Sequence, residues 1–149
     1  MGVYLLDTNI VSLFDPRRRE QAAAVIAWMR HNDRYLSLST ITLAEIEAGI
    51  LKLRRDGKMK RAGEIEALRE DLLAHFGERF LPVDASVALA LAHLAEAARP
   101  NVIEWKDLII AATARAHRLT ILTNNLRHFE PTGVPALDPL ATLPTVAES

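Results

Sequence analysis

The apolar residues of this chain fall into short runs that are separated by longer stretches with helical spacing. The first run ends at Asp7, which places a carboxylate at the C-terminal end of a buried strand. Pro82 lies within the third run and indicates an edge strand, because proline cannot donate a ladder hydrogen bond. The expected strands are residues 3–6, 35–39, 80–83, 120–122 and 134–137.

Between these runs, apolar residues recur every three or four positions, which predicts amphipathic helices. A short helical turn is expected at residues 10–14, before the break at Asp15 and Pro16. The last long helix is apolar on nearly every side, so we expect it to be buried against the sheet. The long helices are expected at residues 20–31, 42–55, 58–76, 85–98 and 107–117.

Strands that alternate with helices predict an α/β fold with a parallel sheet and helices on both faces. We expect one domain at residues 1–138 and a frayed tail at residues 139–149, where no pattern is visible. No apolar run approaches the roughly 20 residues of a membrane helix. No basic segment followed by a long apolar one marks a signal peptide.

Composition limits the possible chemistry. The chain has 149 residues, half of them apolar, which is enough for a core without cross-links. It has no cysteine, which excludes disulfides, thiolate metal sites and cysteine nucleophiles and fits a reducing, cytoplasmic location. The net charge of −1 does not by itself indicate a nucleic-acid binder. The basic residues are nevertheless clustered, at residues 17–19 and again at residues 54–61.

Three acids and one amide are expected at the same edge of the sheet. Asp7 ends the first strand, Glu45 lies in the first turn after the second, and Asp107 opens the buried helix. Asn125 follows the fourth strand. Because the carboxyl ends of parallel strands meet at one edge, these side chains should gather there. Hard oxygen ligands without His or Cys suit Mg²⁺ or Mn²⁺, which can activate water and neutralise a phosphodiester transition state.

Each of these residues also has an ordinary structural interpretation. Asp7 could cap the turn after its strand. Thr42 and Glu45 fit the capping-box spacing, in which Glu45 would hold a backbone N–H. Asp107 could be a helix N-cap or a first-turn acid favoured by the helix dipole, and Asn125 could be a turn residue. The functional interpretation therefore depends on the joint placement of all four.

The basic and histidine residues leave two interpretations open. Arg17, Arg18 and Arg19 are either a solvated loop or a set of phosphate contacts beside the acidic site. The five histidines show no zinc spacing, but His128 is close enough to Asn125 in sequence to face the site.

Four segments taken together resemble the signature of PIN-domain ribonucleases, and among them most closely the VapC-type toxins of toxin–antitoxin pairs. The combined motif is more specific than any of its parts. The resemblance continues in register from Tyr4 to Pro139, which is nearly the whole chain. The four segments are residues 6–10, 42–46, 107–114 and 122–129.

This resemblance implies a five-stranded parallel sheet, a Mg²⁺- or Mn²⁺-dependent RNA endonuclease, a homodimer and a cognate antitoxin protein that blocks the site. It implies that Asp7, Glu45 and Asp107 hold the metal, with Asn125 as a fourth catalytic position. Thr8 and Thr123 match hydroxyl residues of the family near the site, where we expect RNA contacts. His128 stands where many relatives carry Asp, which puts a tightly held second metal in question.

Two other functions compete with this one. A catalytically weak PIN-like module that binds RNA or a partner is favoured by His128 and disfavoured by the three intact acids. An aspartyl phosphotransferase would need a second Asp two positions after Asp7, where this chain has Asn9. For the antitoxin, the helices between residues 42 and 76 offer a groove that suits an amphipathic segment.

Overall fold

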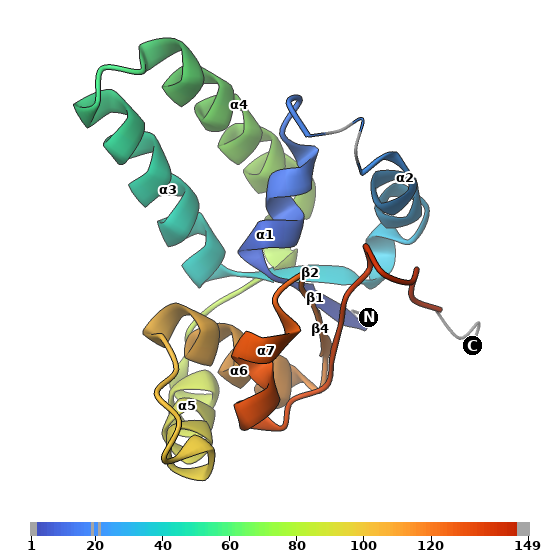
Figure 1. The fold of residues 1–149 in the computed structure, drawn as a ribbon, viewed down its shortest axis with the longest axis vertical. Helices are drawn as coiled ribbons and strands as arrows, with labels where there is room; N and C mark the ends of the chain where they lie inside the picture. The colour runs from blue at the N-terminus through green and yellow to red at the C-terminus, as the bar shows by residue number, and fades with distance from the viewer. Residues whose placement is uncertain (1–2, 19, 21, 146–149) are drawn as a thin grey trace.

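Figure 1 shows a computed structural model of the chain, which describes residues 3–18, 20 and 22–145. A five-stranded sheet runs through its centre in the order β3-β2-β1-β4-β5, with every neighbouring pair parallel. The predicted fold class is therefore confirmed, and the expected edge strand does lie at an edge. The strands are β1 (Tyr4–Leu6), β2 (Leu36–Ser39), β3 (Phe80–Leu81), β4 (Thr120–Leu122) and β5 (Ala136–Leu137).

Helices connect consecutive strands. Three of the connections also contain short 3-10 turns, which are η1 (Ser12–Phe14), η2 (Asp33–Tyr35), η3 (Gly77–Arg79) and η4 (Glu130–Thr132). The α-helices are α1 (Thr8–Val11), α2 (Ala23–His31), α3 (Thr40–Arg55), α4 (Met59–Phe76), α5 (Ala85–Ala98), α6 (Trp105–His117) and α7 (Leu126–Phe129).

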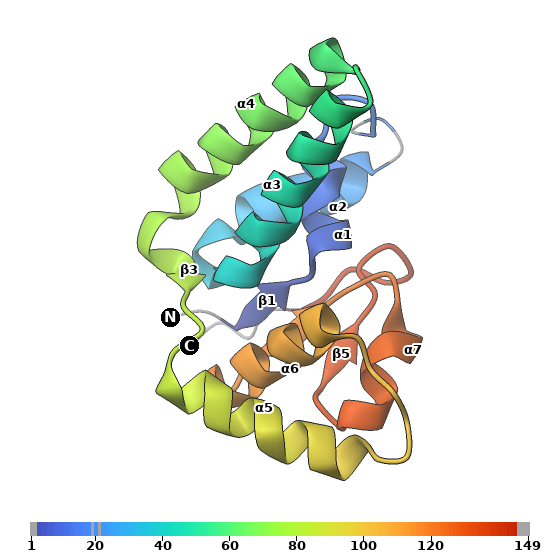
Figure 2. The same cartoon turned by 90° about the vertical axis from the view of Figure 1, so that its left-hand side faces the viewer.

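The sheet has a hydrophobic core on each face, because successive strand residues point to opposite sides. Tyr4 and Leu6 of β1 belong to a core shared with helices α1 to α4. Leu5, between them, belongs to the other core, with α5, α6 and α7. Figure 2 shows α3 and α4 on one side of β1 and α5 with α6 on the other. This arrangement confirms helices on both faces.

Several element boundaries differ from those expected. The second strand begins at Leu36, and all four of its residues are buried. Ser39 ends this strand and caps α3, accepting a hydrogen bond from the Ile41 backbone N–H over 3.2 Å. The helix therefore begins at Thr40, two residues before the expected start at Thr42. Helix α2 begins at Ala23, three residues later than expected.

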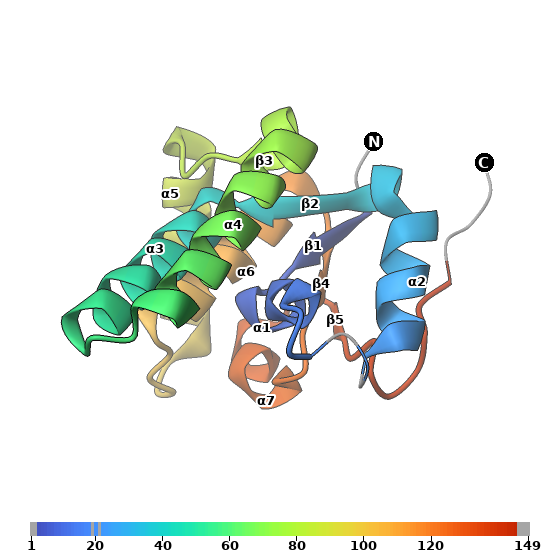
Figure 3. The same ribbon diagram turned by 90° about the horizontal axis from the view of Figure 1, so that it is seen from above.

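The C-terminal tail is not frayed over residues 139–145. Trp28 in α2 donates its indole N–H to the Pro144 carbonyl over 2.8 Å, and Tyr4 donates its hydroxyl to the Thr145 carbonyl over 2.6 Å. Figure 3 shows this last segment running beside α2. Two part-buried hydrogen bonds thus hold a segment whose sequence predicts no helix or strand. Within the described ranges, no helix is long and apolar enough to cross a lipid bilayer.

Candidate active site

The three predicted acids meet at one pocket beyond the C-terminal ends of β1 and β2. Asp7 follows β1 directly, Glu45 is one turn into α3, and Asp107 lies in the first turn of α6. The pocket is open and has a volume of about 300 Å³. Its lining residues are Asp7, Thr8, Asn9, Ser12, Glu45, Glu104, Lys106, Asp107, Asn125 and His128. The structure therefore brings together all four residues that the sequence indicated for catalysis.

Asp7 is held rigidly and is only 6% exposed. Its Oδ1 accepts from the Thr8 backbone N–H over 2.8 Å, which makes it the N-cap of α1, and its Oδ2 accepts from the Thr123 hydroxyl over 2.8 Å. Burial raises the pKa of the Asp7 carboxyl to about 6, and the nearby Asp107 and Glu45 charges add to this rise, while the two hydrogen bonds oppose it. Asp7 is thus a cap and a member of the acidic cluster at once.

Glu45 does not close a capping box. Since Ser39 is the cap of α3, Thr42 lies inside the helix and is fully buried. Glu45 instead reaches across to α1, where its Oε1 accepts from the Thr8 hydroxyl over 2.8 Å. Its Oε2 lies 3.8 Å from the Lys106 ammonium group. The side chain is therefore aimed into the pocket, and the capping interpretation is wrong.

Asp107 is not the N-cap of α6 either, because Glu104 occupies that position. Asp107 is a first-turn acid, and its Oδ2 lies 3.1 Å from Nδ1 of His128 in α7. Burial raises the pKa of the Asp107 carboxyl and the Glu104 charge adds to the rise, whereas His128 lowers it. His128 does face the site, as its sequence position allowed.

A group of polar residues after β4 completes the rim. Asn125 lines the pocket, and its backbone N–H donates to Thr123 Oγ1 over 3.0 Å. Thr123 is fully buried behind Asp7, so its hydroxyl orients that carboxylate and does not face an RNA strand. Asn9 donates from Nδ2 to Asn124 Oδ1 over 2.6 Å and so ties α1 to this segment. Sequence reasoning gave Asn9 only a turn or helix-start role and Asn124 none in the site, although both flank predicted site residues.

The two described arginines of the basic cluster after η1 lie in different environments. Arg17 is paired with Glu64 in α4, with 3.4 Å between Nε and Oε2. Arg18 donates from Nη1 to the Ser12 hydroxyl over 3.2 Å, and Ser12 lines the acidic pocket. Arg19 lies outside the described residues. Sequence reasoning also missed Lys106, whose position directly before Asp107 was the available signal.

The pocket supplies the type of donor that a divalent cation prefers. Three carboxylates and an amide oxygen are hard ligands, and a cation would offset both the burial that raises the pKa of Asp7 and the smaller effect of the Asp107 and Glu45 charges. No three Asp, Glu or His side chains within residues 3–18, 20 and 22–145 are gathered closely enough to hold a metal as they stand. Instead, Glu45 is hydrogen-bonded to Thr8, and Asp107 contacts His128. The donor set fits a divalent ion, because these carboxylates have further lone pairs for a cation in the pocket.

Comparison with known proteins identifies the family. Residues 4–133 match the family model of the PIN domain. The chain is 36% identical over 140 residues to Toxin FitB of Neisseria gonorrhoeae and 32% identical over 138 residues to VapC ribonuclease Y4jK of Sinorhizobium fredii. Each alignment covers 91% of this chain and 96% of the relative. The crystal structure of FitAcB from N. gonorrhoeae matches with a TM-score of 0.72 and 32% identity, over 92% of this chain and 98% of that one.

Proposed function

Because the chain belongs to the PIN-domain family, we propose that it is a Mg²⁺- or Mn²⁺-dependent endoribonuclease and the toxin of a cytoplasmic toxin–antitoxin pair. The observation that carries the proposal is the pocket in which Asp7, Glu45 and Asp107 converge from three separate crossovers. A relative named a VapC ribonuclease supports the ribonuclease activity, and another named a toxin supports the role in a toxin–antitoxin pair.

The side chains have different roles according to their positions in the pocket. Asp7, Glu45 and Asp107 hold the ion, which when bound neutralises charge on the scissile phosphate and lowers the pKa of a bound water. Asn125 orients a water or a substrate oxygen at the opposite rim.

The fixed partners of the acids determine their orientation. Thr123 and the Thr8 backbone N–H occupy one position on each oxygen of Asp7, and the Thr8 hydroxyl holds Glu45. Carboxylate oxygens have further lone pairs, so both acids can still bind a cation from the pocket side.

One observation favours the alternative, a PIN-like module that binds RNA without cutting it. His128 and Lys106 place basic groups against Asp107 and Glu45, where they compete with a metal for the same oxygens.

A cleavage assay separates the two functions. Wild-type protein should cut single-stranded RNA with Mn²⁺ and not with EDTA, and Asp7→Asn and Glu45→Gln should each abolish cutting. Asp56→Asn, an exposed carboxyl at the end of α3, is the matched control. Wild-type protein that binds RNA and leaves it intact with Mn²⁺ would support the binding module.

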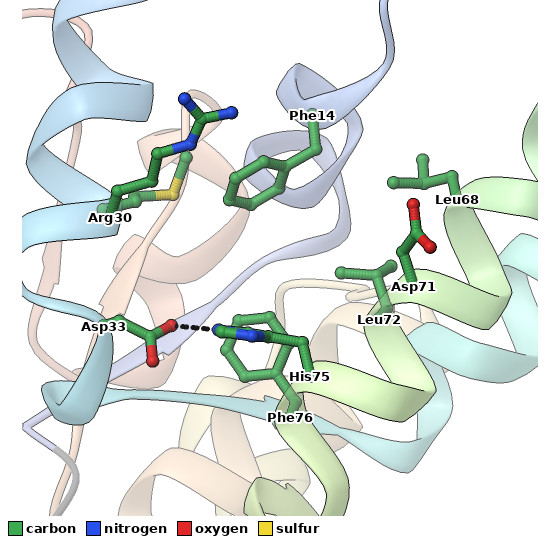
Figure 4. A pocket seen from close by; sticks show the side chains of 9 residues that line it. Phe14, Arg30, Asp33, Leu68, Asp71, Leu72, His75 and Phe76 are labelled. Atoms are coloured by element: carbon green, nitrogen blue, oxygen red, sulfur yellow. Dashed lines mark hydrogen bonds and ion pairs between the residues drawn. The ribbon is translucent and has the colours of Figure 1, made fainter.

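For the antitoxin, we propose a docking site that differs from the expected groove on α3 and α4. An apolar pocket of about 340 Å³ lies between η1, α2 and α4, and no residue of α3 lines it. Figure 4 shows Phe14, Leu68, Leu72 and Phe76 around it, with the 2.6 Å contact between His75 and Asp33 at one side. We propose that its occupant is an apolar side chain of an antitoxin helix, because Phe14, Leu68 and Phe76 line the pocket and a similar solved structure is a toxin–antitoxin complex from Klebsiella pneumoniae.

This docking site has its own test. Leu68→Glu should weaken binding of the co-expressed antitoxin at least tenfold by calorimetry. Leu51→Glu is the control, because Leu51 is 49% exposed on α3 and lines no part of the pocket. Equal binding by both variants would refute the site.

A further inference from the structure

The loop after η1 is fixed to the body of the protein by a buried ion pair. Asp15 is only 3% exposed and accepts from both ends of the Arg61 guanidinium in α4, with 3.0 Å between Nη1 and Oδ1. The Arg17 backbone N–H also donates to Asp15 Oδ1, over 3.2 Å. The Arg18 backbone N–H donates to the Asp15 carbonyl over 2.9 Å. The two arginines therefore have defined positions although their side chains are exposed.

These adjacent arginines point to different places. Arg17 turns toward α4, where it pairs with the Glu64 carboxylate, which also accepts from Arg61 over 2.9 Å. Arg18 turns toward α1, where it donates to the Ser12 hydroxyl at the edge of the acidic pocket. Among the residues that the structure describes, no carboxylate lies within ion-pair distance of Arg18. Arg18 thus brings a positive charge to the pocket, and the Asp15 carboxylate, which is paired with Arg61, acts on it only from a distance.

Charge explains why this position matters. A phosphate that approaches three carboxylates is repelled unless cations are nearby. Lys106 and His128 are already placed against Glu45 and Asp107. Arg18 can instead bind a phosphate in bidentate fashion with its planar guanidinium group.

We infer that Arg18 binds a backbone phosphate of the RNA next to the cleaved bond and positions the strand across the acidic pocket, whereas Arg17 serves only the fold. The inference rests on the proposed nuclease function. Arg18 is a positioning residue, because it lies at the rim and does not contact the acids.

The experiment compares Arg18→Ala with Arg17→Ala. Binding of a short single-stranded RNA is measured by fluorescence anisotropy at several salt concentrations, in EDTA so that the RNA is not cut. One lost phosphate contact should reduce the slope of log affinity against log salt concentration by about 0.7. The ratio of wild-type to variant affinity should therefore be roughly fivefold larger at 0.1 M salt than at 1 M. We expect Arg18→Ala to show both changes, Arg17→Ala neither, and Arg18→Lys a partial recovery. In cleavage with Mn²⁺, Arg18→Ala should raise KM and leave kcat nearly unchanged.

The outcomes separate this inference from the nuclease proposal. If wild-type protein cuts RNA but Arg18→Ala binds with unchanged slope, or if both variants weaken equally, the inference is wrong and the nuclease stands. If Arg18→Ala loses affinity while wild-type protein never cuts, the nuclease proposal fails and the RNA contact stands. If Arg18→Ala keeps RNA binding and loses only antitoxin binding, Arg18 contacts the protein partner and the inference is wrong. Circular dichroism melts of each variant check that the fold is retained.

Discussion

Replacing Asp7 by Asn should make the metal-free protein more stable at neutral pH while it removes the response to metal. Asp7 is 6% exposed, and burial raises its pKa from an ordinary 3.8 to about 6. The folded state therefore binds a proton more tightly than the unfolded chain does. For such a group, stability falls as pH rises from about 4 to about 6, and above pH 6 the full cost of the buried charge remains.

The size of this cost follows from the pKa difference. At 1.36 kcal/mol for each pKa unit, the charged carboxylate costs the fold about 3 kcal/mol above pH 6. Asparagine keeps an oxygen for the Thr8 backbone N–H but places an amide N–H₂ against the Thr123 hydroxyl, which must then reverse its hydrogen bond. We allow about 1 kcal/mol for this change. The variant should therefore gain about 2 kcal/mol at pH 7.5, or about 4–8 °C in Tm.

Bound metal should make wild-type protein more stable than Asp7→Asn. An ion that binds only the folded wild-type site stabilises it by about 2.7 kcal/mol at a hundredfold excess over Kd. That corresponds to a rise of about 5–11 °C in Tm for a domain of this size. Asp7→Asn should show little of this rise, because the most buried of the three carboxylates no longer carries a charge. The assay is a set of thermal melts of both proteins at pH 4.5 and 7.5, with EDTA and with Mn²⁺.

Two results would refute this reasoning. If Asp7→Asn melts below wild type by the same amount at both pH values in EDTA, Asp7 acts only as the cap of α1, and its charge carries no cost. If wild-type protein shows no Mn²⁺ shift at millimolar concentration and no cleavage, the acids do not form a metal site.

Three further predictions concern other parts of the molecule. Asp15→Ala removes the more buried of the two carboxylates that pair with the Arg61 guanidinium and should destabilise the fold by about 2 kcal/mol, measured by urea unfolding at pH 7; an unchanged midpoint would contradict the anchoring of the loop. Thr8→Val removes the donor that orients Glu45 and should lower cleavage about 10- to 100-fold with unfolding within about 1 kcal/mol of wild type; full activity would show that Glu45 needs no orientation. For the homodimer that the family resemblance implies, light scattering at micromolar concentration should give about twice the 16.5 kDa monomer mass, and a monomer throughout that range would reject it.

The sequence by itself determined which residues could carry the chemistry. Apolar runs mark β1 and β4 because a central parallel strand is buried on both faces and tolerates few polar residues. Asp7 ends one such run, so its place at the sheet's carboxyl edge follows from local pattern alone. The positions of α4 and α5 were likewise predictable to within one residue, because their apolar stripes are long and have clear ends.

Only the tertiary structure decided what each side chain contacts. Thr42 and Glu45 have the spacing of a capping box, but Ser39, three residues before Thr42, caps α3, so Glu45 turns to Thr8 in another segment. Arg17 and Arg18 are chemically identical and adjacent, yet one faces Glu64 and the other faces Ser12. Sequence spacing fixes direction only within one helix or strand. Contacts between elements depend on how the layers pack, because packing decides which polar groups remain within hydrogen-bond distance of one another.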